Sequence, residues 1–184
     1  MTITPTPISG CFVLTPRIFN DDRGYFFESY NTQAFNDAAG AGINFVQDNQ
    51  SFSTKGVLRG LHLQKGEHAQ SKLVRVTLGE VLDIAVDLRK NSPTYGLYHA
   101  VILSDKNHSQ FFIPRGFAHG FVVLSAAAIF QYKCDNYYHK ASEGGLHYAD
   151  PSLAIDWNLP ATELLVSEKD GELPFLKDAG DFGF

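Results

Sequence analysis

The stretch Val57-Leu58-Arg59-Gly60-Leu61-His62-Leu63-Gln64 is an apolar, strand-like run that contains an arginine and a histidine. Successive side chains of a β-strand point to opposite faces, so a polar residue in phase with apolar neighbours points toward an interior. Burying such a group is unfavourable unless it finds a partner. Strict alternation places Arg59 and His62 on opposite faces, although Gly60 between them could allow a β-bulge that re-aims one side chain.

Three later stretches repeat this pattern. Lys72 shares its alternation phase with two nearby valines, Tyr132 is in phase with Phe130, and His119 lies in the run Pro114–Phe121. Taken alone, each has a structural interpretation: a satisfied core histidine, a lysine that extends to solvent, or a packed tyrosine. Together, the four polar intrusions predict a polar cavity inside a β-structure.

Length and composition favour a single all-β domain over residues 1–184. The chain has fifteen Phe, eight Tyr, sixteen Gly and one Met, which suits strands better than a helical bundle. Strand-like runs recur about every 8–12 residues between turn signals, as in a sandwich or barrel. One helix is expected over 32–39, with Asn31 as its N-cap and Gly40 as its end. The expected strands are 10–14, 24–30, 44–52, 56–64, 72–78, 81–88, 98–103, 110–113, 120–124 and 128–134, and one or two helical turns are expected within 160–184.

Charge and cysteine content exclude several classes of function. The net charge of −5 argues against a general nucleic-acid role. No run approaches about 18 apolar residues, so no membrane span is expected, and the start of the chain lacks the features of a signal peptide. Cys11 and Cys134 form no ligand cluster; a buried thiol is expected at Cys134, and the pair fits a reducing cytoplasm.

The segment Pro114-Arg115-Gly116-Phe117-Ala118-His119 matches the second half of the cupin signature, Pro-x-Gly-x-x-His. The first half normally supplies His-x-His and then a Glu as metal ligands, but here it reads His62-Leu63-Gln64, and Glu67 comes a little early. The pattern resembles a cupin barrel without its metal, in which His62 serves proton transfer. A metal-dependent cupin oxygenase using His62, Glu67 and His119 stays an alternative.

Eight motifs follow one another in order along residues 10–170: Asp22–Glu28, Gln47–Ser51, Gly56–His62, Gln70–Val74, Gly79–Arg89, Ser92–Gly96, Pro114–Phe121 and Ser167–Asp170. In these motifs the chain resembles the dTDP-4-dehydrorhamnose 3,5-epimerase family of dTDP-sugar epimerases. The departures are mild: Leu63 stands where an aromatic is frequent, and Ser71 where Ala is common.

The resemblance implies a cupin-type jelly-roll barrel with a few short helices, a homodimer, and no cofactor or metal. It implies that His62 is the catalytic base, Tyr132 the acid, Asp170 the carboxylate that orients His62, and Lys72 the group facing the C4 carbonyl oxygen. The substrate would be dTDP-4-dehydro-6-deoxyglucose, with Tyr138 stacked on thymine. The other implied ligand contacts are Arg23, Glu28, Gln47, Asn49, Arg59, His119, Glu143 and Lys169.

Two further alternatives stay open at this point. An enzyme that inverts only C3 would use the same base. A non-catalytic sugar-nucleotide binder has no need of a proton acid and base, so the presence of His62, Lys72, Tyr132 and Asp170 together argues against it.

Overall fold

The computed structural model describes residues 1–40 and 42–184, which fold into 14 strands, two α-helices and four short 3₁₀ segments. The helices are α1 Thr32–Ala39 and α2 Glu168–Gly171, and the 3₁₀ segments are η1 Gly66–His68, η2 Lys140–Ser142, η3 Ala161–Glu163 and η4 Leu176–Asp178. The strands are β1 Thr2–Pro5, β2 Phe12–Thr15, β3 Phe19–Asp21, β4 Gly24–Phe26, β5 Gln47–Thr54, β6 Val57–Gln64, β7 Lys72–Leu78, β8 Glu80–Asp87, β9 Tyr98–Ser104, β10 Gln110–Ile113, β11 Phe117–Val123, β12 Ala127–Cys134, β13 Glu143–Gly145 and β14 Leu165–Val166.

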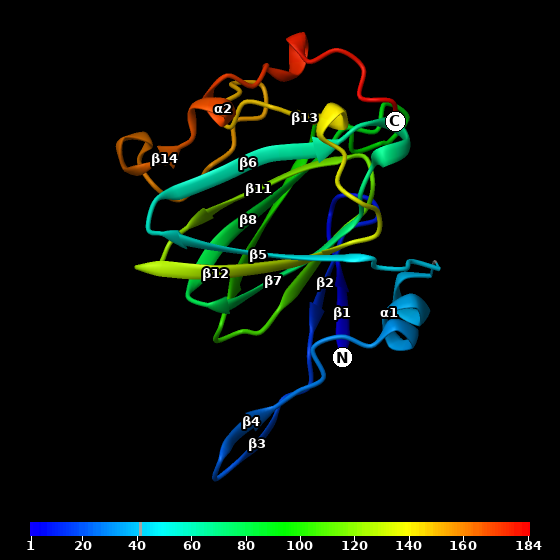
Figure 1. Cartoon of the computed structure of the whole chain (residues 1–184), viewed down its shortest axis with the longest axis vertical. Coiled ribbons are helices and arrows are strands. Elements are labelled where there is room, and N and C mark those ends of the chain that lie inside the picture. Colours follow the sequence, from blue (N-terminus) through cyan, green and yellow to red (C-terminus); the bar gives the residue numbers. More distant parts are fainter. Residues whose placement is uncertain (41) are drawn as a thin grey trace.

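Two sheets face each other and form the body of the molecule (Figure 1). The β5 sheet has the order β1-β2-β10-β7-β12-β5, and the β6 sheet has the order β13-β6-β11-β8-β9, with β14 added beside β6. Every strand pairing that the structure describes is antiparallel except β14 with β6. The prediction of an all-β, cupin-type jelly roll is confirmed.

Alternation along the strands builds the core between the two sheets. Val74 and Phe130 of the β5 sheet pack with Val81, Ala85 and Phe121 of the β6 sheet. The opposite face of the β6 sheet is also apolar, and the C-terminal segment covers it. Because both of its faces are covered, β8 is buried along almost its whole length.

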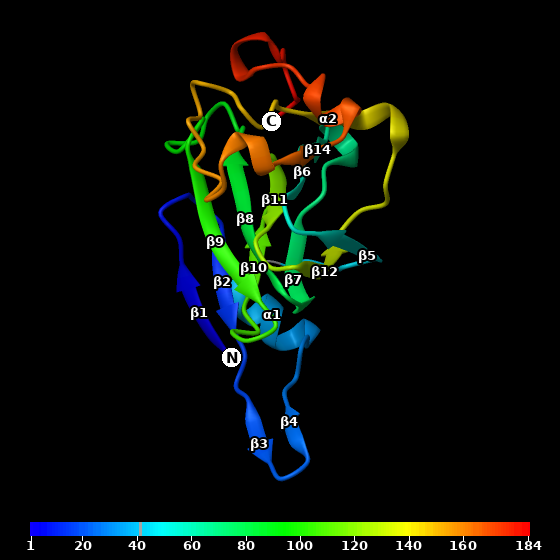
Figure 2. The ribbon, with the colours of Figure 1, turned by 90° about the vertical axis from the view of Figure 1, so that its left-hand side faces the viewer.

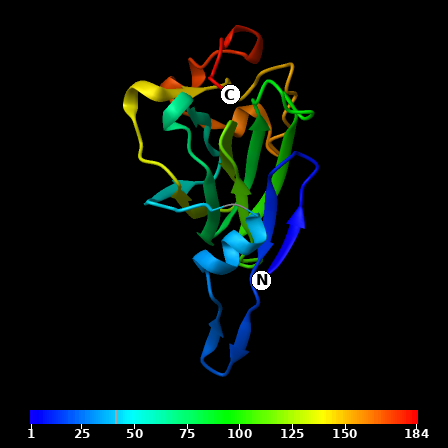
Figure 3. The same ribbon diagram turned by 90° about the vertical axis from the view of Figure 1, so that its right-hand side faces the viewer.

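Helix α1 covers part of the outer face of the β5 sheet (Figure 3). Its buried Phe35 packs against Phe12 and Phe112. The predicted cap is confirmed, since the side chain of Asn31 accepts a hydrogen bond from the Ala34 N–H, and Gly40 ends the helix in the left-handed conformation.

The hairpin β3–β4 projects away from this body, at the end opposite α2 (Figures 1 and 2). Three of its aromatic side chains are at least half exposed: Phe19 at 50%, Tyr25 at 60% and Phe26 at 70%. Large apolar side chains exposed to this extent favour contact with another molecule.

The predicted strands occur with boundary shifts, and one prediction is wrong in extent. The strand expected over 24–30 ends at Phe26, because it pairs only with the short β3 and then leaves the sheet for α1. Strands β1, β3, β13 and β14 were not expected; each has two to four residues, too few for an alternating pattern to be visible.

Both thiols are buried and unpaired, as expected for Cys134. Among residues 1–40 and 42–184, no helix is both long and apolar enough to cross a membrane.

Candidate active site

Two adjoining cavities of about 570 and 580 Å³ lie between the β5 and β6 sheets, at the side closed by α2. Their linings share Asn49, His62, Lys72, Tyr132 and Lys169. The two cavities together bring all the predicted catalytic and binding residues into one place except Arg23 and Glu28. Those brought together are Gln47, Asn49, Arg59, His62, Lys72, His119, Tyr132, Tyr138, Glu143, Lys169 and Asp170.

A β-bulge in β6 lets Arg59 and His62 face the same space. His62 pairs with His119 and Arg59 with Phe121, so β6 has one residue more than β11 between the paired positions. Gly60 lies at the bulge with φ +133°, and a Cβ there would come within 2.5 Å of the Cα of Gly120. The strands can approach this closely only because residue 60 is glycine, which confirms the bulge expected there.

Asp170 holds the imidazole of His62. Nε2 of His62 lies 2.7 Å from Oδ1 of Asp170, and the other carboxylate oxygen accepts the N–H of Gly60 at 3.2 Å. Ser167 caps α2 and so places Asp170 against β6. Burial opposes ionisation of Asp170, but the hydrogen bonds from His62 and Gly60 outweigh it and lower the pKa of the carboxyl.

Tyr132 and Lys72 reach the cavity from the facing sheet, as their alternation phase predicts. The ammonium of Lys72 lies 5.9 Å from the centre of the Tyr132 ring. Burial lowers the pKa of Lys72, whereas Cys134 and Asp83 act in the opposite direction. Burial raises the pKa of Tyr132, so the phenol stays protonated at neutral pH.

His119 is buried, lies opposite His62 in the pairing of β11 with β6, and contacts Asp83, whose carboxylate oxygens lie 2.9 and 3.1 Å from its Nε2. Burial lowers the pKa of His119 and raises the pKa of Asp83, while the charges of His119 and Lys72 act against that rise. The sequence reasoning missed Asp83. It lies in phase with Val81 and Ala85 in an apolar strand, the same signal that singled out Lys72.

Polar groups at the cavity mouth bind one another. The Tyr138 hydroxyl donates to Oε1 of Glu143 at 2.9 Å, and Nζ of Lys169 donates to Oε2 at 2.6 Å. The hydrogen bond from Lys169 lowers the pKa of Glu143. In the second cavity, Nε of the exposed Arg59 donates to the buried Ser53 hydroxyl at 3.1 Å, which leaves the terminal guanidinium nitrogens for an anionic ligand.

Arg23 and Glu28 lie outside this cavity in the same chain. Arg23 is in the turn of the β3–β4 hairpin, where it pairs with Asp21 at 2.6 Å. Glu28 follows β4, and its carboxylate accepts the side-chain amide of Asn31 at 3.2 Å.

The three residues of the oxygenase alternative do not come together. Glu67 is exposed beside His68 and lines neither cavity, and His119 is occupied by Asp83. In the part of the chain that the structure describes, no three His, Cys, Asp or Glu side chains form a cluster suited to a metal ion.

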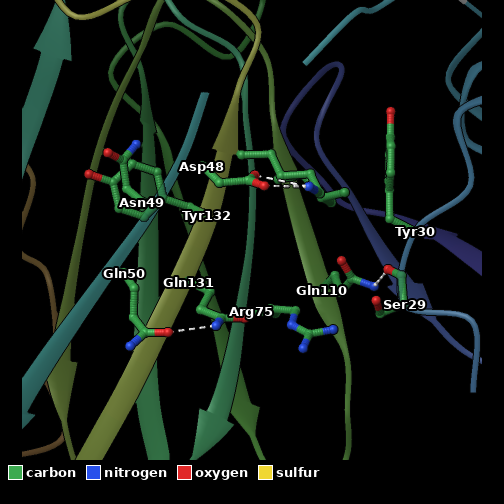
Figure 4. A pocket seen from close by; sticks show the side chains of 11 residues that line it. Ser29, Tyr30, Asp48, Asn49, Gln50, Arg75, Gln110, Gln131 and Tyr132 are labelled. Atoms are coloured by element: carbon green, nitrogen blue, oxygen red, sulfur yellow. Dashed lines mark hydrogen bonds and ion pairs between the residues drawn. The ribbon is translucent and has the colours of Figure 1, made fainter. Parts of the chain in front are cut away.

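A smaller cavity of about 310 Å³ lies on the outer face of the β5 sheet (Figure 4). Its polar side chains bind one another: Lys133 pairs with Asp48 at 2.9 Å, and the Gln131 amide donates to Gln50 at 2.7 Å. By alternation these side chains lie on the opposite face from Asn49 and Tyr132. Its lining also includes Asn49 and Tyr132, but not His62, Lys72 or Asp170, so this cavity lacks the base that the inner site contains.

An oriented histidine and a protonated phenol that face one cavity from opposite sheets suit an enzyme that uses general acid–base catalysis. A sequence model described as dTDP-4-dehydrorhamnose 3,5-epimerase matches residues 5–178. The chain is 52% identical to the dTDP-4-dehydrorhamnose 3,5-epimerase of Escherichia coli, over 94% of this chain and 93% of that one. The chain belongs to the dTDP-4-dehydrorhamnose 3,5-epimerase family, whose members are isomerases.

Solved structures agree with this assignment. The fold matches a dTDP-4-dehydrorhamnose 3,5-epimerase from Elizabethkingia anophelis with a TM-score of 0.93 and 53% identity, covering 97% of each chain. It also matches a dTDP-6-deoxy-D-glucose-3,5-epimerase from Legionella pneumophila in complex with dTDP-4-keto-L-rhamnose, with a TM-score of 0.92 and 50% identity, over 96% of this chain and 93% of that one.

Proposed function

We propose that this chain, acting as a single domain over residues 1–184, inverts C3 and C5 of dTDP-4-dehydro-6-deoxy-D-glucose and yields dTDP-4-dehydro-L-rhamnose. One observation carries the proposal: His62, held by Asp170, and Tyr132 line the same cavity from facing sheets. The relative that binds dTDP-4-keto-L-rhamnose supports the substrate class. Two free, buried thiols accord with a reducing cytoplasm as the site of action.

The chemistry follows from the acidity of the protons that flank the C4 ketone. His62 removes the proton from C3 or C5, the electron pair of that C–H bond forms a double bond to C4, and the π pair of the C4 carbonyl moves to its oxygen as an enolate. Lys72 stabilises this oxyanion inside the cavity. Tyr132 returns a proton to the same carbon from the opposite face, which inverts the centre. His62 then releases its proton to solvent and Tyr132 regains one from solvent, and the cycle repeats at the other carbon.

The remaining cavity residues suit the rest of the ligand. Arg59 is positioned for the diphosphate, Tyr138 for stacking on thymine, and Glu143 and Lys169 for polar contacts near the mouth. Gln47, Asn49 and His119 complete the lining. Arg59→Ala should weaken dTDP binding, and unchanged affinity would refute the phosphate role.

A homodimer accounts for Arg23 and Glu28. Both belong to or follow the projecting hairpin, whose exposed aromatic residues need a partner surface. In a symmetric dimer each hairpin would reach the cavity of the other copy, so each site would use residues of both chains. Light scattering at micromolar concentration should give twice the 20.4 kDa chain mass.

Mixed dimers test this sharing directly. His62→Asn inactivates the site of its own chain, and Arg23→Ala weakens the site that receives its hairpin. If the hairpin acts on the partner, mixing the two weak variants creates one fully wild-type site per mixed dimer, and activity rises. If it acts on its own chain, mixing gives no gain, and the exchange is excluded.

Incubation with dTDP-4-dehydro-6-deoxyglucose in deuterated water tests the activity itself. Deuterium should enter C3 and C5, as read by NMR, and inversion at both centres should follow. Deuterium at C3 alone would identify an enzyme that inverts only that carbon. His62→Asn should abolish exchange at both carbons, a loss of about 10²–10⁴-fold, while dTDP binding stays largely intact.

A further inference from the structure

The segment of residues 135–142, between β12 and β13, carries Tyr138 to the cavity mouth; we call it the Tyr138 loop. It forms no strand pairing in the described structure around Tyr138. Instead, side-chain oxygens accept three successive backbone N–H groups. Asn136 accepts from Tyr137 at 2.9 Å, Gln47 from Tyr138 at 3.1 Å, and Gln64 from His139 at 3.0 Å.

Gln64 is the most buried of these acceptors, with 7% of its surface exposed. It is the last residue of β6, two positions after His62, and it also lines the cavity. A rigid strand therefore holds the backbone of the residue next to Tyr138. The His139 ring adds a second contact, since it stacks on His68 with centroids 3.9 Å apart.

The other end of the loop is anchored separately. Nε2 of Gln70 donates to the Asn136 carbonyl at 2.8 Å, and Asn136 Nδ2 donates to the Glu67 carbonyl at 3.0 Å. Tyr138 lies between these anchors and Gln64, with 51% of its surface exposed to the cavity mouth and solvent. Its position is thus fixed by contacts to the backbone on both sides.

We propose that Gln64 is a positioning residue for nucleotide recognition, which holds the Tyr138 loop so that the Tyr138 ring is in place before the base arrives. The inference rests on the proposed function, in which Tyr138 stacks on thymine. A ring that is already ordered loses less conformational entropy on binding than one that must be ordered by the ligand. Loss of the Gln64 hydrogen bond should therefore weaken nucleotide binding without altering proton transfer.

Gln64→Met removes the acceptor with little change in volume. It should weaken dTDP binding about two- to tenfold, as the loss of one hydrogen bond predicts, and leave kcat at saturating substrate unchanged. Trypsin should cleave the ligand-free variant faster after Lys140, because the loop is less restrained. Gln110→Met is the matched control: Gln110 is similarly buried and donates to the Ser29 carbonyl at 2.7 Å, outside the Tyr138 loop.

A double-mutant cycle with Tyr138→Ala separates positioning from direct contact. Tyr138→Ala alone should weaken dTDP binding about fivefold or more, the loss expected for base stacking. In that background Gln64→Met should cause no further loss. Equal losses in both backgrounds would overturn the inference, because Gln64 would then act on the ligand or on the fold independently of Tyr138.

Two outcomes keep the inference distinct from the proposed function. If Tyr138→Ala binds dTDP normally, the stacking role and the positioning role both fail, while deuterium exchange still judges the epimerase activity. If Gln64→Met does not fold, Gln64→Glu replaces it, because this variant keeps an acceptor oxygen. Gln64→Glu should bind the uncharged nucleoside thymidine as the wild type does. Loss of thymidine binding in Gln64→Glu would also contradict the inference.

Discussion

Nε2 of His62 and Oδ1 of Asp170 lie 2.7 Å apart, although 108 residues separate the two in the sequence. The second oxygen of Asp170 accepts the N–H of Gly60, so the carboxylate is fixed to the strand that carries His62 as well as to the ring. In the proposed mechanism, His62 donates its Nε2–H to Asp170, which leaves the lone pair of Nδ1 for the substrate proton. The carboxylate then stabilises the imidazolium that forms.

Asp170→Asn should reduce kcat about 100-fold or more and leave dTDP affinity nearly unchanged, because an amide neither fixes the tautomer nor stabilises imidazolium. The measurement is steady-state kinetics with separate dTDP titrations. Glu168→Gln, an exposed change on the same helix, is the control and should behave as the wild type. Near-normal kcat in Asp170→Asn would show that His62 does not depend on this contact.

Loss of the Lys72 charge should produce the alkaline limb of the pH–rate profile. Burial lowers the pKa of Lys72. The ammonium is therefore charged at low pH and loses its charge, as pH rises, at a lower pH than is usual for lysine. Burial raises the pKa of Tyr132, which moves ionisation of the phenol further from neutral pH. The rate kcat should therefore fall with the Lys72 charge. In Lys72→Arg the limb should move to higher pH, since arginine stays charged; a limb that does not move would contradict this assignment.

Activity should survive exhaustive treatment with a chelator. The reason is the sequence His62-Leu63-Gln64, which lacks the second histidine of a cupin metal site, together with the exposed position of Glu67 away from the cavity. The assay is turnover before and after EDTA, followed by addition of single metals. Loss of turnover that one particular metal restores would contradict the proposed mechanism.

Strand alternation predicted which strand residues face the cavity, but not that α2 brings Asp170 against it. Lys72 and Tyr132 could be placed inside because a period of two is a local property, and Gly60 could be marked because a bulge needs a residue that tolerates close approach. The same rule would have found Asp83. The contact of Asp170 with His62 depends on the path of the C-terminal segment, which no local pattern specifies, so it was available only through family resemblance.

The position of the β3–β4 hairpin could not be predicted from the local sequence pattern either. Arg23 and Glu28 lie in or after short strands that pair only with each other and belong to neither large sheet, so their sequence context gave no sign that they lie outside the cavity. Only the arrangement of the whole chain shows this.

Asp87 should contribute to stability rather than to catalysis. It is fully buried and accepts hydrogen bonds from Arg89 at 2.7 Å, Ser92 at 2.5 Å and Thr94 at 2.7 Å. Asp87→Asn should lower the free energy of unfolding by about 2–4 kcal/mol at pH 7. Urea denaturation at fixed protein concentration measures it. Asp181→Asn, which affects an exposed pair with Lys90, should have almost no effect.

The destabilisation by Asp87→Asn should depend on pH with a definite sign. Burial opposes ionisation of Asp87, but its hydrogen bonds outweigh burial and lower the pKa of the carboxyl in the folded state. A depressed folded-state pKa contributes stability above the unfolded pKa of about 3.9, and this is lost as pH falls through the folded value. The difference between wild type and variant should therefore shrink in acid; a constant difference would argue against an ionised Asp87.

Tyr132→Phe should separate proton removal from inversion. The phenol enters the cavity from the sheet that faces His62, so the two groups are assigned to opposite faces of the sugar. Without the hydroxyl, His62 can still remove a proton and Lys72 can still hold the enolate. His62 then returns a proton, or a deuteron after exchange with solvent, only to the face it left. The variant should therefore incorporate deuterium at C3 or C5 with little inverted product, as NMR of the recovered sugar nucleotide can show. Inversion at near wild-type rate would make Tyr132 a packing residue, and the acid would then have to be another group, such as a water held by His119.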